Sequence, residues 1–128
     1  MRTFISICLL ALISFNQAFA NSRPSHKEEA RCVAVFDVAS SLLEEDGTVP
    51  DKVSAIKEFS RRMSLRLALD STVKEAKGFA RIQSKEQDRL YARVNAAATD
   101  DETDSVYDSI FQDVETCKNL LPAPIALL

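Results

Sequence analysis

The sequence predicts an all-α fold, a small antiparallel four-helix bundle closed by one disulfide bond. The 128 residues include only two glycines and four prolines, too few turn-forming residues for a sandwich or a barrel. Apolar residues recur at three- and four-residue steps in four segments, which is the period of an amphipathic helix. A composition of 46% hydrophobic and 27% charged residues is ordinary for one globular domain.

The first twenty residues have the features of a secretory signal peptide. A short basic start is followed by an apolar run over residues 4–15, and Ala18-Phe19-Ala20 has the small-x-small pattern that signal peptidase accepts. The apolar run is shorter than the ~20 residues needed to span a bilayer, which disfavours a retained membrane anchor. We therefore expect cleavage after Ala20 and a mature domain of residues 21–128 in a bacterial periplasm or outside the cell.

Cleavage would leave two cysteines, Cys32 and Cys117, because Cys8 lies within the signal peptide. Two cysteines in an oxidising compartment are expected to pair. The bond would close a loop of 85 residues, for which chain entropy gives an upper stabilisation of about 4.6 kcal/mol. Neither cysteine lies in a C-x-x-C pattern, so a structural role is favoured over a redox-active one.

The first helix is expected over residues 25–45. Ser25 and Glu28 form a capping box at its start, and Asp46-Gly47 supplies a left-handed stop at its end. A single apolar stripe follows the helical period and includes the first cysteine of the predicted disulfide. The stripe consists of Cys32, Val35, Phe36, Ala39, Leu42 and Leu43.

The second helix is expected over residues 50–70. Pro50 suits the first position of a helix, where no backbone N–H is needed. Leu65 and Leu69 fall off the main apolar stripe, which predicts that this helix is buried on more than one side. The main stripe consists of Val53, Ile56, Phe59, Met63 and Leu67.

The third helix is expected over residues 72–98. A continuous helix over residues 50–98 would be roughly 70 Å long, too long for so small a domain. Thr72 and Glu75 form a second capping box after the poor helix formers Asp70-Ser71, so the break is expected there. A break between residues 78 and 84 is the alternative.

The fourth helix is expected over residues 101–121. Thr99 and Glu102 form a third capping box, and Pro122 stops the helix. In an up-down-up-down bundle the start of the first helix and the end of the last are neighbours, which is where the two cysteines lie. The apolar tail at residues 125–128 either packs on the bundle or docks elsewhere.

Charge is distributed unevenly along the predicted mature chain. Residues 21–51 carry 3 basic and 7 acidic residues, residues 52–93 carry 11 and 5, and residues 94–128 carry 1 and 7. The third helix has a basic ridge, with cations at steps of three, four, four, four and four. Such a ridge is either a solvated face or a surface for an anionic partner. Its members are Lys74, Lys77, Arg81, Lys85, Arg89 and Arg93.

Few residues suit catalysis or metal binding. His26 is the only histidine, and one histidine with two disulfide-bonded cysteines cannot complete a tetrahedral metal site. The acidic residues from Asp100 to Asp108 lack the spacing of a calcium loop and suit the first turns of a helix. The helical serines lie in no G-x-S-x-G or S-x-x-K motif. We therefore predict no catalytic residue, no metal and no cofactor.

The predicted function is binding rather than catalysis. We expect a periplasmic interaction protein, an inhibitor of the immunity type or a chaperone-like module, in contact with another exported or envelope protein that has an acidic surface. Two alternatives stay open, a binder of anionic lipid headgroups or glycan through the basic helix face and an unrecognised hydrolase. Nucleic acid is not an expected partner of an exported protein with a pI near 5.2.

These expectations are tested by the intact mass of the exported protein under non-reducing conditions. The mass should correspond to residues 21–128 without two hydrogen atoms, because the signal peptide is removed and the two thiols are joined. Retention of residues 1–20, or two thiols that react with an alkylating reagent before reduction, would contradict the corresponding expectation.

Overall fold

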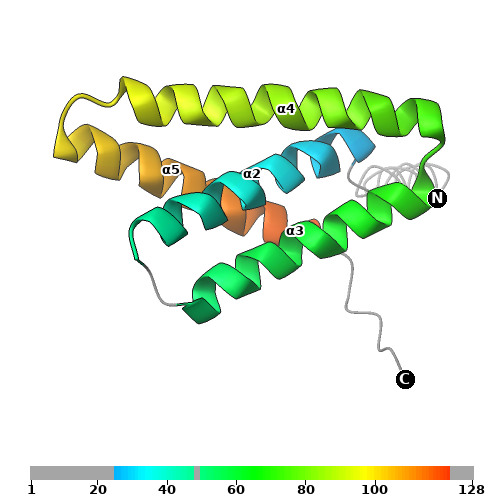
Figure 1. Ribbon diagram of the computed structural model, residues 1–128, viewed down its shortest axis with the longest axis horizontal. Helices are drawn as coiled ribbons and strands as arrows, with labels where there is room; N and C mark the ends of the chain where they lie inside the picture. The colour runs from blue at the N-terminus through cyan, green and yellow to red at the C-terminus, as the bar shows by residue number, and fades with distance from the viewer. Residues whose placement is uncertain (1–24, 48–49, 122–128) are drawn as a thin grey trace, which may run out of the picture.

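A computed structural model describes residues 25–47 and 50–121, so the predicted signal peptide at residues 1–20 and the apolar tail at residues 125–128 lie outside the described residues. The described residues form four helices and no strand, which confirms the all-α class. Figure 1 shows each helix running back along the long axis relative to the helix before it. The helices are α2 (His26–Glu45), α3 (Pro50–Asp70), α4 (Val73–Ala96) and α5 (Asp100–Lys118).

Three of the helices begin at the predicted caps. The hydroxyls of Ser25, Thr72 and Thr99 each accept a hydrogen bond of 3.2 Å from a backbone N–H three residues later. These bonds satisfy N–H groups that have no partner within the helix. At the end of α2, Gly47 has a φ of +70°, the left-handed conformation that glycine adopts without a steric penalty.

The chain turns between α3 and α4 at the preferred position. Helix α3 ends at Asp70 and Thr72 caps α4, which then continues as a helix through residues 78–84. The alternative break is therefore wrong. Helix α4 ends two residues before its predicted limit at residue 98. Helix α5 ends three residues before its predicted limit at residue 121, because the backbone N–H groups of residues 119–121 bond to carbonyls three residues earlier instead of four.

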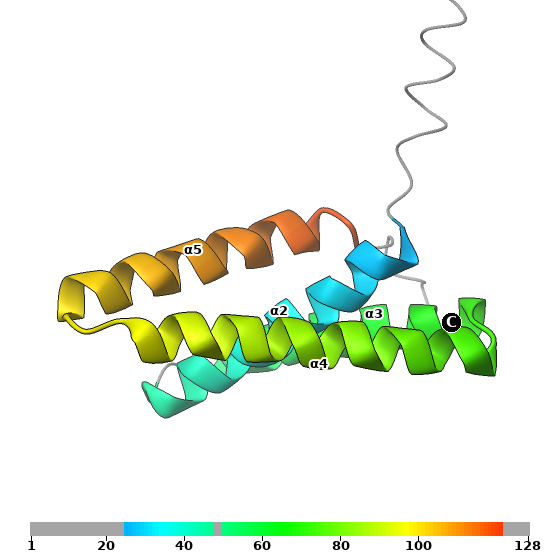
Figure 2. The ribbon, with the colours of Figure 1, turned by 90° about the horizontal axis from the view of Figure 1, so that it is seen from above.

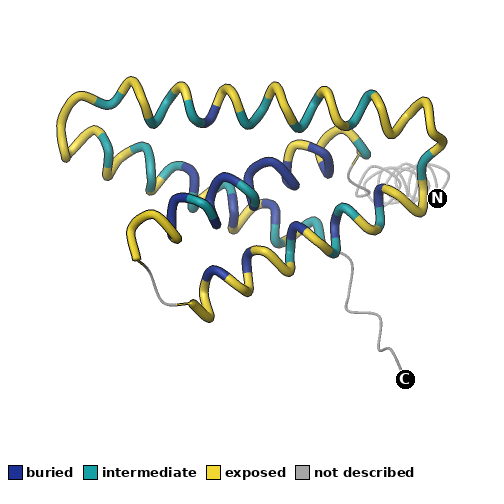
Figure 3. Tube along the Cα trace, in the orientation of Figure 1, coloured by how far each residue is buried: buried dark blue, intermediate teal, exposed yellow. Residues whose placement is uncertain are grey.

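Helix α2 occupies the centre of the bundle. It packs against all three other helices, whereas the consecutive helices α3 and α4 have little contact with each other. Figure 3 shows the buried residues gathered along α2, where almost every position from Ala30 to Leu43 is buried. A helix that is apolar on all sides is stable in water only when other elements surround it.

The other helices cover different sides of α2. Helices α4 and α5 are joined by the turn at residues 97–99 and diverge from that turn along their length (Figure 2). Helix α4 has one fully buried residue, Leu90, so it lies at the edge of the core. None of the helices in the described ranges is long and apolar enough to cross a membrane.

The disulfide between Cys32 and Cys117 is present and joins α2 to α5. The Cα atoms of the two cysteines are 5.4 Å apart, within the range that a disulfide requires. Both side chains are buried and belong to the hydrophobic core. The pairing that the sequence predicted is therefore confirmed.

The prediction that the second helix is buried on more than one side is wrong. Leu65 and Leu69 are 51% and 76% exposed, because α3 contacts the core on the side that faces α2 and has little contact with α4 and α5. The helix that is buried on several sides is α2, in which Val33, Ala34 and Val38 are buried beside the predicted stripe.

Two leucines of α3 provide a matched test of this orientation. Leu67 is 4% exposed and Leu69 is 76% exposed. Leu67→Ala should lower the free energy of unfolding by about 2–5 kcal/mol, since it leaves a cavity in the core. Leu69→Ala should change it by no more than about 0.5 kcal/mol. Urea denaturation followed by circular dichroism measures both, and equal losses would contradict the orientation of α3.

Candidate functional site

Four members of the predicted basic ridge are exposed on one side of α4. Their side chains form no ion pair with the described residues, and they follow one another at three- and four-residue steps. We refer to this surface as the α4 basic face. It consists of Lys74, Lys77, Arg81 and Lys85.

The last two members of the ridge have partners within the protein. Arg89 donates two hydrogen bonds to the Glu86 carboxylate, at 2.6 and 3.0 Å. Arg93 is half-buried and donates to the Ser109 hydroxyl of α5 at 2.9 Å. Four of the six predicted ridge residues therefore form the exposed α4 basic face. The other two form hydrogen bonds, Arg89 within α4 and Arg93 across to α5.

The basic residues of α3 are arranged differently from those of the α4 basic face. Lys57 pairs with Glu44 of α2, and Arg61 pairs with Glu58 one turn earlier. Arg66 lies between Glu29 and Asp70. Much of the positive charge of α3 is thus offset within the protein, and the unpaired positive charge is concentrated on α4.

The side of α4 opposite the basic face contacts the core. Leu90 is buried, and Phe79 and Val94 are half-buried against the core. Gln83 and Gln87 are half-buried too. Ala76, which the helical projection also places on the apolar side, is exposed because the first turns of α4 extend beyond the core.

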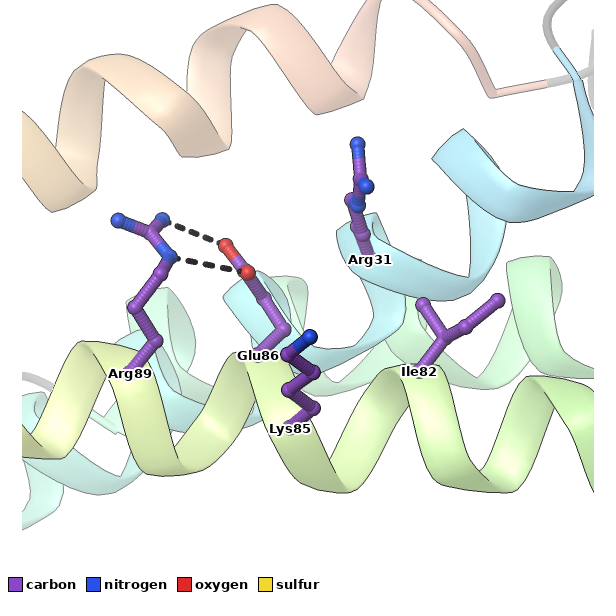
Figure 4. A pocket seen from close by; sticks show the side chains of 5 residues that line it. All are labelled: Arg31, Ile82, Lys85, Glu86 and Arg89. Carbon is purple, nitrogen blue, oxygen red and sulfur yellow. Dashed lines mark hydrogen bonds and ion pairs between the residues drawn. The ribbon is translucent and has the colours of Figure 1, made fainter.

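A cleft of about 510 Å³ lies beside the α4 basic face, between α4 and α2. Figure 4 shows Arg31 rising from α2 beside the paired side chains of Glu86 and Arg89. Lys85 and Ile82 of α4 complete the lining. The cleft therefore contains three cations, one carboxylate and one apolar side chain.

The electrostatics of the cleft keep Glu86 ionised. Its hydrogen bond from Arg89 lowers its pKa, burial opposes this effect, and the charges of Arg31 and Arg93 lower the pKa further. The same hydrogen bond raises the pKa of Arg89. Glu86 thus offsets Arg89, while Arg31 and Lys85 form no ion pair with the described residues.

Sequence reasoning missed Arg31 and Glu86 as parts of this cleft. Arg31 and Lys85 are 54 positions apart in the chain, so no local pattern connects them. One signal was available, because Arg31 is the only basic residue between Ala30 and Leu43, a stretch that is otherwise mostly apolar. A cation kept in such a stretch must reach the surface or find a counter-charge.

Glu29 is a second feature that the sequence reasoning missed. Its side chain is fully buried, and neither carboxylate oxygen accepts a hydrogen bond from the described residues. The Nε atom of Arg66 lies 3.5 Å from one of these oxygens. Burial raises the pKa of Glu29 above its ordinary value of 4.5, although the charges of Arg66 and His26 act in the opposite direction.

The groups considered for catalysis make structural contacts. Ser60 donates a hydrogen bond to the Asp37 carboxylate at 2.5 Å, which links α3 to α2. Ser40 donates to the backbone carbonyl of Asp37 at 3.0 Å. His26 meets the ring of Phe79 edge-on, with the ring centroids 5.7 Å apart. In the described ranges no three histidine, cysteine or acidic side chains are grouped as metal ligands would be.

Comparisons with protein-family models, with curated proteins and with solved structures find no match to this chain. The function is therefore inferred from the residues and geometry of the molecule itself.

The buried carboxyl of Glu29 predicts a particular dependence of stability on pH. Because the pKa of Glu29 is raised in the folded protein, the folded state holds this proton more tightly than the unfolded state does. The contribution of Glu29 to stability is then most favourable below its ordinary pKa of 4.5 and declines as the pH rises through the folded pKa.

We therefore expect the wild type to lose stability relative to Glu29→Gln as the pH is raised from about 4 to about 7. Glu28→Gln is the matched control, since Glu28 is the exposed neighbour of Glu29. The difference in the free energy of unfolding between Glu28→Gln and the wild type should change much less across this pH range than the difference for Glu29→Gln. Urea denaturation across this pH range measures both differences. A pH-independent difference for Glu29→Gln would show that the pKa of Glu29 is not raised by folding.

Proposed function

We propose that this protein is an exported, non-catalytic binding protein that uses the α4 basic face to hold an acidic surface of another exported or envelope protein. In this proposal the helices form an antiparallel bundle that acts as a rigid support, and α4 is the side that meets the partner. An inhibitor of the immunity type and a chaperone-like module both act through contacts of this kind.

The observation that carries the proposal is the row of unpaired cations on α4. Like charges at four-residue spacing destabilise a helix by a few tenths of a kcal/mol for each pair. In α3 the cations Lys57, Arg61 and Arg66 are paired with acidic side chains. Lys74, Lys77 and Arg81 of α4 have no ion-pair partner among the described residues. An external acidic partner would supply the missing counter-charge.

The shape of α4 suits such a partner. From Lys74 to Lys85 the α4 basic face extends roughly 16 Å at 1.5 Å per residue. Helix α4 has 24 residues, and its contact with the core is on the opposite side from these cations. A row of charges on a regular helix steers an oppositely charged protein and sets its register.

The contacts of the serine and histidine side chains favour binding over hydrolysis. Ser60 and Asp37 are engaged with each other between two core helices. His26 contacts an aromatic ring, and Ser40 bonds to the backbone of its own helix. In this proposal these residues maintain the fold, and the unpaired cations of α4 bind the partner.

Charge reversal on α4 tests the proposed function. Lys77→Glu combined with Arg81→Glu should weaken capture of an acidic exported protein at least about tenfold, because attraction becomes repulsion. Stability should change by less than about 1 kcal/mol, since both side chains are exposed and lack ion pairs. The matched control is Lys27→Glu combined with Lys52→Glu, which changes the net charge equally at two exposed positions on α2 and α3.

The measurement is capture of proteins from an envelope extract at low and at high salt, followed by the dissociation constant of each captured protein. Support requires one stoichiometric acidic protein that binds the wild type and the control, is lost with the α4 variant, and dissociates as salt screens the charges. Binding to anionic lipid vesicles or glycan in place of a protein would overturn the proposal. So would equal effects of the α4 variant and the control.

A further inference from the structure

The cleft beside the α4 basic face has an excess of positive charge that its own residues do not neutralise. Glu86 accepts both hydrogen bonds of the Arg89 fork, and only 15% of its side chain is exposed. Each oxygen of the Glu86 carboxylate already accepts a hydrogen bond from Arg89, so Glu86 does not neutralise Arg31 and Lys85 as well. Arg31 and Lys85 reach the cleft from two different helices and form no ion pair with the described residues.

The position of Arg31 is the strongest indication that this charge has a ligand. The helix that carries it is buried from Ala30 to Leu43 at almost every position. Arg31 is exposed, and its side chain stands at the cleft next to the Glu86–Arg89 pair (Figure 4). A concave site that is partly shielded from water strengthens the attraction of its cations for an anion.

The lining also indicates which anion fits. An arginine fork binds the two oxygens of a carboxylate side by side, and a lysine adds a single point charge. Ile82 gives the cleft an apolar side, which suits the methylene groups of an acidic side chain. The Glu86 carboxylate in the same lining repels a doubly charged phosphate more strongly than a singly charged carboxylate.

We propose that this cleft binds an aspartate or glutamate side chain from an acidic segment of a partner protein, held between Arg31 and Lys85. This inference rests on the proposed function and names a specific contact within it. Glu86 acts as a positioning residue that holds Arg89 at the wall of the cleft. The α4 basic face supplies the general attraction, and the cleft fixes one acidic side chain of the partner.

A blocked peptide of six glutamates is the probe for this site. Titration of the isotope-labelled protein, followed by nuclear magnetic resonance at low ionic strength, should give saturable shifts of the Arg31 side-chain Nε–H and of the backbone amides from 82 to 89. Arg31→Gln combined with Lys85→Gln should raise the dissociation constant at least tenfold. Lys27→Gln combined with Lys52→Gln is the matched control, because both lysines are exposed and lie outside the α4 basic face and the lining of the cleft. It removes the same charge and should raise the dissociation constant less than about threefold.

The fold of both double variants is verified by the dispersion of the amide spectrum, which should be unchanged because the four side chains are exposed and form no ion pair. Equal weakening by the two variants, or no saturable shift at Arg31 in the wild type, would overturn the proposed site. A response to inorganic phosphate but not to the peptide would overturn the assignment to a carboxylate.

The same variants distinguish failure of this inference from failure of the proposed function. When charge reversal at Lys77 and Arg81 abolishes capture of the partner but the change at Arg31 and Lys85 does not, the proposed function stands and the cleft is not its contact. When neither pair of changes affects capture, the proposed function itself is wrong. A loss of capture with both pairs is the result that both proposals require.

Discussion

The burial of α2 on nearly all sides is the constraint on which the rest of the structure depends. An apolar helix without a polar face is stable in water only when it is surrounded. The other helices therefore pack against α2 far more than against one another. The disulfide reinforces this packing, because it joins Cys32 of the central helix α2 to Cys117 of α5.

This arrangement leaves α4 with one side free. Because α2 already contacts three helices, α4 needs to supply only a narrow apolar strip, in which Leu90 is the one fully buried residue. The remaining surface of α4 is available for charge. Helix α5 diverges from α4 (Figure 2). Arg31 of the central helix lines the cleft together with Glu86 and Arg89 of α4 (Figure 4). The candidate site thus follows from how the core is covered.

Charge is balanced in different ways in different parts of the bundle. At the beginning of α2, Glu29 is buried and Arg66 is its nearest cation. This carboxylate lacks hydrogen bonds from the described residues, so it is an energetic cost that the apolar packing around it must offset. On α4, by contrast, the exposed cations cost little in water and remain available to a partner. An unpaired charge is therefore costly in the interior, whereas on the surface it costs little and can bind a partner.

The sequence by itself determined the helices, their caps and the break at Asp70-Ser71, because these depend on local hydrogen bonding. It also predicted the pairing of Cys32 with Cys117, from the expectation that Cys8 is removed with the signal peptide. It also located the basic ridge, since helical period is a local property. Only the tertiary structure decided that α2 is central, that Leu69 is exposed, and that Arg31 shares a cleft with Lys85. Helical periodicity shows which residues lie on the same face of one helix. Which helix packs against that face depends on how all four helices together bury their apolar residues.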